Sequence, residues 1–408
     1  MHPTARSAAS MIVLWVACAI PLSARFAAAQ EKILYSFGNT AGDGRFPLAG
    51  LVFDSSGNLY GTDYDGGADG LGTVFELSPA KVGGWFERTL YSFNRTRTLP
   101  GLNPRASLIV DGTGDLYGTT SGAQGGYGTA FELKHWPSGG WTFKVLHEFG
   151  DDGKPQANLV FDTEGNLYGT TLLGSAFELI PTTSGSWTYS VLHNFLGHGD
   201  GQSPTAGMIF DGVGNLYGTT SMGGAHSYGS VFELSPTGDG GWSVNLLHSF
   251  EKNNDDGITP WAGLILDGSG NLYGTTAGGG ANGAAGTKPG GTVFEMSLQG
   301  DGTWAETLLH SFGSGTDGSE PVGSLIFDPA GNLYGITGSG GVYGLGTLFR
   351  LTPAAGGGWT ETVLHNFGNG KDGSNPIGTL ILDSTGDLYG TTSAGGLYGG
   401  GTVFKFTP

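Results

Sequence analysis

Two neighbouring loops break the repeat pattern of this sequence and carry side chains that could do chemistry. The first loop contains Asp63, Asp65 and Asp69, and the link that follows it contains Arg95 and Arg97. Carboxylates in such a loop could ligate a metal or act as acid and base, and the arginines could hold an anion. The alternative is a surface salt-bridge patch, which contributes little to stability. The sequence leaves both interpretations open.

Aromatic side chains offer a second candidate binding surface. Tyr127, Tyr228 and Tyr343 lie in Gly-rich loops, where aromatic rings could contact a sugar or a protein. A tryptophan also opens the last segment of six repeats: Trp85, Trp141, Trp187, Trp242, Trp304 and Trp359. Tryptophans can stack on sugars, but one per repeat at a fixed offset favours a packing residue at the rim of the molecule.

Five histidines share one position of a repeated Leu-His-x-Phe phrase, and tyrosine takes that position in two more copies. These residues are His147, His193, His248, His310 and His365, with Tyr35 and Tyr91. Each would lie on a different strand, so the five side chains cannot share one ion. We predict a packing residue with one hydrogen-bonded ring nitrogen. Six of the links carry an Asp-Gly pair, which we interpret as a turn, because one such Asp per link supplies fewer than the about six to eight oxygen ligands of Ca²⁺. Neither a metal nor another cofactor is predicted.

A repeated β-structure must position these candidates. A phrase of the form Asp-x-x-Gly-Asn-Leu-Tyr-Gly-Thr-Thr recurs with its tyrosine at Tyr60, Tyr117, Tyr168, Tyr217, Tyr273, Tyr334 and Tyr389. The average spacing of about 55 residues is typical of repeat architectures. Each repeat contains four segments with strand patterning, which in one copy are 323–328, 332–337, 346–351 and 359–367.

The ends of the chain decide between an open solenoid and a closed ring. The last repeat stops after its third strand, at 402–406, while 31–37 has the pattern of a spare fourth strand. Pairing the two completes a seventh blade and leaves no unpaired edge at the join. We therefore predict an all-β fold, a seven-bladed β-propeller of four-stranded antiparallel blades that is closed by its N-terminal strand. Residues 30–408 would form this single domain.

The first 29 residues have the layout of a secretory signal peptide. Arg6 precedes an apolar run over 8–22, and the small residues 27–29 offer a cleavage site. The run is shorter than the about 20 apolar residues that span a bilayer, and no later segment approaches that length, so no transmembrane segment is expected. We predict a secreted, periplasmic or extracellular protein. Lipid anchoring at Cys18 is the alternative.

The charge of the chain limits its partners. It has 35 acidic and 17 basic residues, for a formal net charge of −18. A nucleic-acid partner is disfavoured because phosphate binding needs a basic surface. No Ser/His/Asp order, metal-ligand spacing or phosphate-binding motif occurs in a suitable context. The expected partner is an extracellular glycan or protein, and the expected state is a monomer.

The repeated phrases resemble those of the bacterial tandem-repeat proteins called GloVer repeat proteins. The resemblance covers nearly all of 31–408, through phrases such as Gly-Asn-Leu-Tyr-Gly-Thr-Thr at 270–276 and Gly-Thr-Val-Phe-Glu at 291–295. It implies an exported repeat protein and no known activity, so no catalytic residue is carried over. The phrase at 264–273 is also similar to those of NHL and lactonase-type propellers, which implies the fold alone.

Three functions remain compatible with the sequence. The first is an exported binding or scaffold module that recognises a glycan or protein through its loop face. The second is a propeller enzyme, a polysaccharide lyase or hydrolase, with Asp63, Asp65 or Asp69 as metal ligands or acid and base groups. The third is a purely structural cell-surface protein. Whether the chain is an enzyme stays open.

Overall fold

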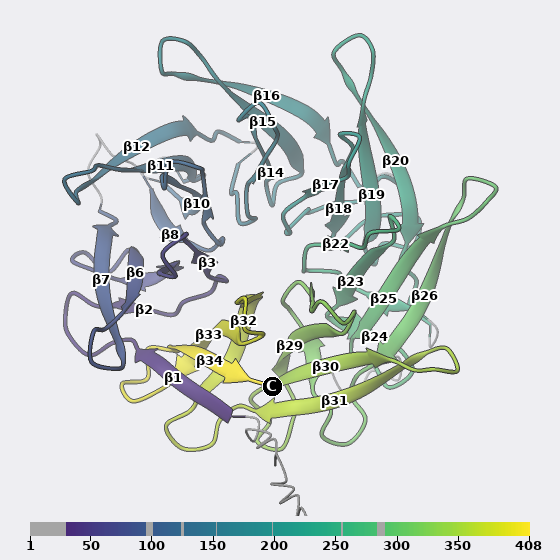
Figure 1. The fold of residues 1–408 in the computed structure, drawn as a ribbon. Coiled ribbons are helices and arrows are strands. Elements are labelled where there is room, and N and C mark those ends of the chain that lie inside the picture. Colours follow the sequence, from purple (N-terminus) through teal and green to yellow (C-terminus); the bar gives the residue numbers. More distant parts are fainter. Residues whose placement is uncertain are drawn as a thin grey trace, which may run out of the picture.

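The chain forms a closed ring of seven antiparallel β-sheets, or blades, in the computed structural model (Figure 1). The structure describes residues 30–94, 101–123, 126–151, 153–197, 199–253, 256–283 and 290–408. Within these ranges no residue is helical, so no helix here could cross a membrane. The seven-bladed β-propeller predicted from the sequence is confirmed.

Each blade has four strands, which follow one another outward from the axis. The innermost strand has two residues in blades one to six and ten residues in blade seven. Blade one contains β3 (Val52–Phe53), β4 (Leu59–Asp63), β6 (Thr73–Pro79) and β7 (Trp85–Ser92). Blade two contains β9 (Ile109–Val110), β10 (Leu116–Gly122), β11 (Thr129–His135) and β12 (Trp141–Glu148). Blade three contains β13 (Val160–Phe161), β14 (Leu167–Thr170), β15 (Ser175–Pro181) and β16 (Trp187–Asn194).

The next three blades repeat this order. Blade four contains β17 (Ile209–Phe210), β18 (Leu216–Thr220), β19 (Ser230–Pro236) and β20 (Trp242–Ser249). Blade five contains β22 (Ile265–Leu266), β23 (Leu272–Thr276), β25 (Thr292–Leu298) and β26 (Trp304–Ser311). Blade six contains β28 (Ile326–Phe327), β29 (Leu333–Ser339), β30 (Thr347–Pro353) and β31 (Trp359–Asn366). Short strands in the inter-blade links are β2 (Gly44–Arg45), which pairs with β5 (Asp65–Gly66), β8 (Leu102–Pro104), β21 (Gly257–Ile258), which pairs with β24 (Gly278–Gly279), and β27 (Ser319–Pro321).

The seventh blade joins the two ends of the described chain. It contains β32 (Gly373–Leu382), β33 (Leu388–Gly395), β34 (Thr402–Thr407) and, as its outer strand, β1 (Gln30–Ser36). Figure 1 shows β1, in purple, beside the yellow β34. The pairing has a bulge between Ile33 and Tyr35, and the outer strand of every other blade has a bulge at the same place. β1 therefore replaces a fourth strand in register, as predicted.

The hydrophobic core is divided among the seven junctions between blades. Each junction holds one cluster of buried side chains contributed by both neighbouring blades. A fully buried phenylalanine on the third strand, such as Phe131, lies against the glycine of the Leu-Tyr-Gly phrase in its own blade. A Cβ atom at Gly118 would be 2.7 Å from the Cζ atom of Phe131, which leaves no room for a larger residue. This close approach explains why the glycine recurs.

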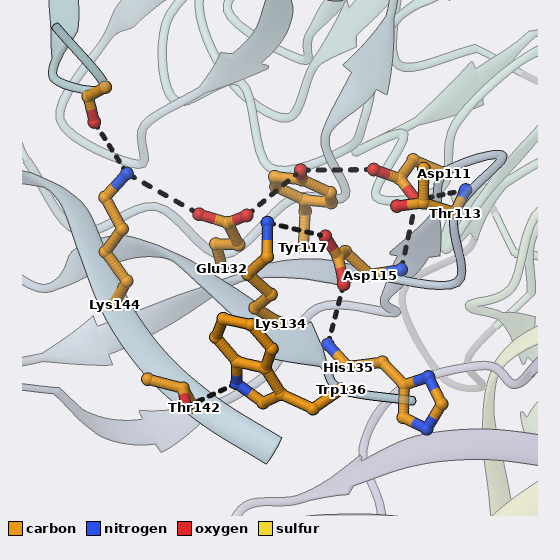
Figure 2. Close-up of polar contacts among 11 residues, drawn as sticks. Asp111, Thr113, Asp115, Tyr117, Glu132, Lys134, His135, Trp136, Thr142 and Lys144 are labelled. Carbon is orange, nitrogen blue, oxygen red and sulfur yellow. Dashed lines mark hydrogen bonds and ion pairs between the residues drawn. The ribbon is translucent and has the colours of Figure 1, made fainter. Parts of the chain in front are cut away.

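The repeated aspartate fixes the turn between the first and second strands. In blade two, Asp111 Oδ1 accepts hydrogen bonds from the backbone nitrogens of Thr113 and Asp115, at 2.8 and 3.0 Å, and the Tyr117 hydroxyl donates to Asp111 Oδ2 at 3.3 Å (Figure 2). The equivalent bonds from Asn332 and the backbone hold the pKa of Asp328 below its ordinary value, although partial burial acts to raise it. The aspartate and tyrosine of the repeated Asp-x-x-Gly-Asn-Leu-Tyr phrase therefore stabilise the turn.

The tryptophans pack between blades. Each ring contacts, edge-on, the repeated tyrosine of a neighbouring blade, with centroids 6.0 to 6.5 Å apart. Every one of the six is partly buried. The arrangement agrees with the packing role predicted for them.

Ring closure predicts that β1 stabilises the whole molecule. Leu34 is buried in the junction of blades seven and one, whereas Lys32 on the same strand is exposed. Leu34→Asp should lower the free energy of unfolding by about 3 kcal/mol or more, because it buries a charge without a partner. Lys32→Asp, the matched control, should change it by less than about 1 kcal/mol. Chemical denaturation would check both values, and a parent-like Leu34→Asp variant would argue against the closed ring.

Candidate functional site

A cavity of about 630 Å³ lies at the axis of the ring, on the face that carries the inter-blade links. Its wall receives one residue from every blade, the residue that follows the link proline: Leu48, Arg105, Gln156, Thr205, Trp261, Val322 and Ile377. Loops between the second and third strands add Leu172, Ser221 and Met222. We call this space the central cavity.

The post-proline position is where the repeat varies most clearly. A proline precedes it and an alanine or glycine follows it in all seven copies, yet the seven residues are of seven different types. By contrast, the core phenylalanine and its glycine partner are the same in every blade. The sequence interpretation looked for asymmetry in the longer loops and missed this position. The sequence did contain evidence for this position, because it varies in every repeat while a proline always precedes it and a small residue always follows it.

Strained links hold these side chains at the cavity. The residue before each link proline has a positive φ, between 53° and 64°, although none of the seven is glycine. Such a conformation costs about 1 to 3 kcal/mol and persists only where its surroundings impose it. Here the preceding blade does so: the backbone nitrogen of Asn103 donates to the carbonyl of Leu71 at 2.9 Å, and that of Thr259 donates to the carbonyl of Tyr228 at 2.8 Å.

The link proline also packs against the preceding blade. A Cβ atom built on Gly229 would be 2.6 Å from the Cδ atom of Pro260, and one on Gly72 would be equally close to Pro104. Glycine is needed at these positions because the backbone has a positive φ and a Cβ atom would meet the proline and also, at 2.4 and 2.5 Å, the carbonyl oxygens of Thr220 and Asp63. The residue after the proline is thus placed by contacts from two blades.

The cavity narrows along the axis. A space of about 80 Å³ continues between the small residues of the inner strands. There, Asn158 Oδ1 accepts a hydrogen bond from the backbone nitrogen of Ser107 at 2.8 Å and ties blade three to blade two. On the opposite side, a Cβ atom at Gly50 would lie 2.5 Å from the carbonyl oxygen of Thr379. The wide part of the central cavity is therefore the part that could take a ligand.

The wall of the central cavity combines one cation with apolar and neutral polar groups. Arg105 is the one charged side chain among its described lining residues, and its guanidinium lies 5.2 Å from the centroid of the Tyr64 ring. Its Nη1 atom donates to Gln156 Oε1 at 3.4 Å. Trp261 is 50% exposed, and Thr205 Oγ1 is buried without a hydrogen-bond partner. This wall could bind a ring, an anion and hydroxyl groups.

The residues predicted from the sequence lie elsewhere. Asp65 pairs with Arg45 through β5 and β2, Asp69 is exposed, and Tyr343 is 47% exposed at a loop tip. Tyr127 and Tyr228 are partly buried against the core clusters of their junctions. Arg95 and Arg97 lie outside the described residues. None of those that the structure describes lines the central cavity, and their role in binding stays a prediction.

Asp63 requires a correction. The sequence suggested an exposed loop acid, but its side chain is fully buried at the end of β4, where the other six blades have threonine. Asp63 Oδ2 accepts a hydrogen bond from Thr73 Oγ1 at 2.7 Å, in place of the hydroxyl pair that Thr120 and Thr129 form in blade two. Burial raises the pKa of Asp63 well above its usual range. The Asp63 carboxyl group therefore takes the structural place of the threonine hydroxyl found in the other blades.

Among the described residues, His193, His248, His310 and His365 each lie beside a link aspartate of the Asp-Gly pairs interpreted above as turns. One ring nitrogen is hydrogen-bonded, as predicted, in His365, whose Nε2 lies 2.8 Å from Asp372 Oδ2, and in His193, whose Nε2 lies 2.9 Å from Asp200 Oδ2. His310 Nε2 lies 3.5 Å from Asp317 Oδ2 and makes no hydrogen bond to the described residues. A glutamate on the next outer strand joins some of these pairs. His248 Nε2 lies 3.2 Å from Asp256 Oδ2 and 3.9 Å from Glu306 Oε2.

Two such groups could in principle hold a metal, because their donor atoms lie within 4.8 Å of one another: His248, Asp256 and Glu306, and His365, Asp372 and Glu31. Asp256, however, already accepts hydrogen bonds from the backbone nitrogens of Glu251 and Gly257. At the junction of blades seven and one, Tyr35 replaces the histidine and donates to Asp43 at 3.2 Å. We interpret the groups as polar parts of the junctions, and the absence of a metal stays a prediction.

Comparison with known sequences establishes the family. The sequence model of the Gloeobacter/Verrucomicrobia repeat matches residues 24–179, 172–357 and 284–408. The chain belongs to this repeat family. The resemblance to GloVer repeat proteins is thereby confirmed. No curated protein matches the sequence significantly.

Solved structures similar to this Gloeobacter/Verrucomicrobia repeat protein share its fold. One is the extracellular domain of a hybrid two-component system from B. thetaiotaomicron, with a TM-score of 0.52 and 14% identity over 94% of this chain and 41% of the other. Another is an ancestral GH74 enzyme, with a TM-score of 0.57 and 12% identity over 88% of this chain and 48% of the other. The chain spans less than half the length of either. At these identities the likeness shows the fold alone.

The burial of Asp63 predicts that threonine stabilises this position. Asp63→Thr should raise the free energy of unfolding at pH 7.5 by about 1 kcal/mol or more, because it restores the hydroxyl pair and removes a buried acid. Asp65→Thr, a partly exposed control in the same loop, should be nearly neutral. Urea denaturation would measure both. Lost ligand binding at unchanged stability would instead support the binding role predicted for Asp63.

The junction of blades four and five predicts that stability falls as the pH rises from about 4.5 to above 7. Burial and then the Asp256 carboxylate raise the pKa of Glu306 from 4.5 to about 7. The pKa of His248 is also raised by Asp256 and Glu306, although burial acts to lower it. Both groups hold their protons more tightly in the folded protein, so their contribution is complete below pH 4.5 and is lost as the pH rises through about 7.

Glu306→Gln should therefore reduce the loss of stability between pH 5 and 8.5 by about 1 to 3 kcal/mol. Glu164→Gln, at an exposed turn, should leave the pH dependence unchanged. Denaturation midpoints at several pH values would give the comparison. An identical pH profile for parent and Glu306→Gln would show that the pKa of Glu306 is not raised.

Proposed function

We propose that this protein is an exported binding module that recognises an extracellular glycan in its central cavity. The observation that carries the proposal is the post-proline position, where seven copies of one link present seven different residue types to one cavity. A rigid repeat supplies the geometry, and the variable residues make one asymmetric site instead of seven weak ones. Binding residues commonly lie on loops held by such scaffolds.

The size and chemistry of the cavity support a glycan. Pockets for small ligands typically have volumes of about 300 to 1,000 Å³, and the central cavity measures about 630 Å³. Trp261 offers a half-exposed aromatic face, and the amide of Gln156 offers hydrogen-bonding groups in the same cavity. A folded protein surface would not reach into this cavity, whereas a few sugar rings would.

Two further observations support export and binding. Residues 1–29 have the pattern of a signal peptide, and one solved structure of the same fold is an extracellular domain. Hydrolysis of a glycosidic bond generally needs two carboxyl groups, while the described wall of the cavity has Arg105 as its charged group. We therefore propose binding without turnover.

The proposed function predicts that Trp261 is needed for recognition. Trp261→Ala should weaken binding about 10-fold or more, because stacking on an aromatic face and the apolar area of the ring are lost. Trp136→Ala is the matched control, since Trp136 is 46% exposed and lies on an outer hairpin. Ligands would come from a glycan array and polysaccharide digests, with affinities measured by calorimetry. A ligand that binds both variants like the parent would place recognition outside the cavity.

A further inference from the structure

We propose that the ligand of the central cavity is a short acidic oligosaccharide that contains a uronate, with its carboxylate on Arg105 and Gln156 and a sugar ring on Trp261. The inference rests on the proposed function and adds the class of ligand. Three features of the cavity wall carry it: an arginine prepared for an anion, the neutral polar side chain of Gln156, and the separation of these two residues from Trp261 around the ring.

Arg105 is prepared to receive an anion. It is exposed and forms no ion pair with a carboxylate of the described residues, although acidic residues outnumber basic ones two to one in this chain. The ring of Tyr64 supports its guanidinium, which limits the entropy lost on binding. One N–H group of Arg105 donates to Gln156 Oε1, so most of its five donors remain for a ligand. A carboxylate can accept two of them in parallel.

The neutral polar groups distinguish a sugar acid from a simple hydrophobic acid. Thr205 Oγ1 is buried in the cavity wall, where a ligand does not reach it, but the amide of Gln156 has donors to offer. A fatty or aromatic acid would leave this amide unpaired, whereas a sugar hydroxyl can pair with it. The carbon–hydrogen face of a sugar ring fits the apolar surface formed by Trp261 and Val322.

The positions of these groups set the length of the ligand. Arg105 belongs to blade two and Trp261 to blade five, three blades further around the ring. A ligand that contacts both must cross the cavity, which at about 630 Å³ accommodates two or three sugar units. The polar residues of blades two to four therefore face one end of the ligand, and the apolar residues of blades five to seven face the other.

The test uses defined pairs of ligands. Di- and trisaccharides of galacturonate, glucuronate and mannuronate would be compared with their methyl esters by calorimetry, on the parent, Arg105→Gln and Trp261→Ala. We expect the parent to bind at least one acid about 10-fold to 100-fold more tightly than its ester, as a charge-assisted bidentate pair implies. Arg105→Gln should remove this difference and leave the affinity for the ester unchanged, and added salt should weaken binding of the acid alone.

Controls separate this inference from the proposed function. Arg88→Gln removes an exposed arginine that pairs with Glu76 on an outer strand, and should have no effect on binding. Equal affinity for acid and ester, or binding of none of the acids, overturns the uronate inference. If another glycan then binds the parent and loses affinity in Trp261→Ala, the proposed function stands without it. If Trp261→Ala changes the affinity for no ligand, the proposed function fails as well. Parent-like melting of each variant shows that it is folded.

Discussion

Every blade of this propeller buries its two faces against its neighbours, so the pairing of β1 with β34 determines whether blades seven and one have a complete environment. The seven hydrophobic clusters lie between blades, and each needs two of them. An open ring would expose one cluster and two blade faces at once. Closure also creates the central cavity, because its wall takes one residue from each of the seven blades.

Closure and strain together place the variable residues. The seven positive φ angles before the link prolines are unfavourable, and in six of the links the backbone nitrogen of this residue donates to a carbonyl of the preceding blade. A link in isolation would relax, and its post-proline side chain would lose its direction. Because the constraint acts on the backbone, the type of residue after each proline can change without disturbing the scaffold. The asymmetry of Arg105, Gln156 and Trp261 therefore costs the fold little.

Six of the seven junctions are of two kinds, which differ in the side chain that faces the repeated Tyr or His. At the junctions of blades one with two and two with three, aromatic rings stack, as Tyr91 does on Phe143 and His147 on Tyr189. At the four junctions from blades four and five to blades seven and one, a partly buried glutamate takes that place, and burial beside an aspartate raises the pKa of Glu31, Glu87, Glu306 and Glu361 to about 7. A dependence of stability on pH is therefore expected at these four junctions.

The sequence by itself determined the number of blades and the four strands of each blade, because these follow from patterns that repeat along the chain. It also predicted the closing role of β1, because the last repeat has three strands and 31–37 has the pattern of a fourth. It led to the hypothesis that asymmetry marks the functional site. It did not locate the proposed site. Asp63 has the pattern of a loop acid but is buried at the end of β4. Arg105 and Trp261 are 156 positions apart in the sequence, yet both line the central cavity. Tertiary structure decided both points, because burial and convergence on one axis depend on how all seven blades close.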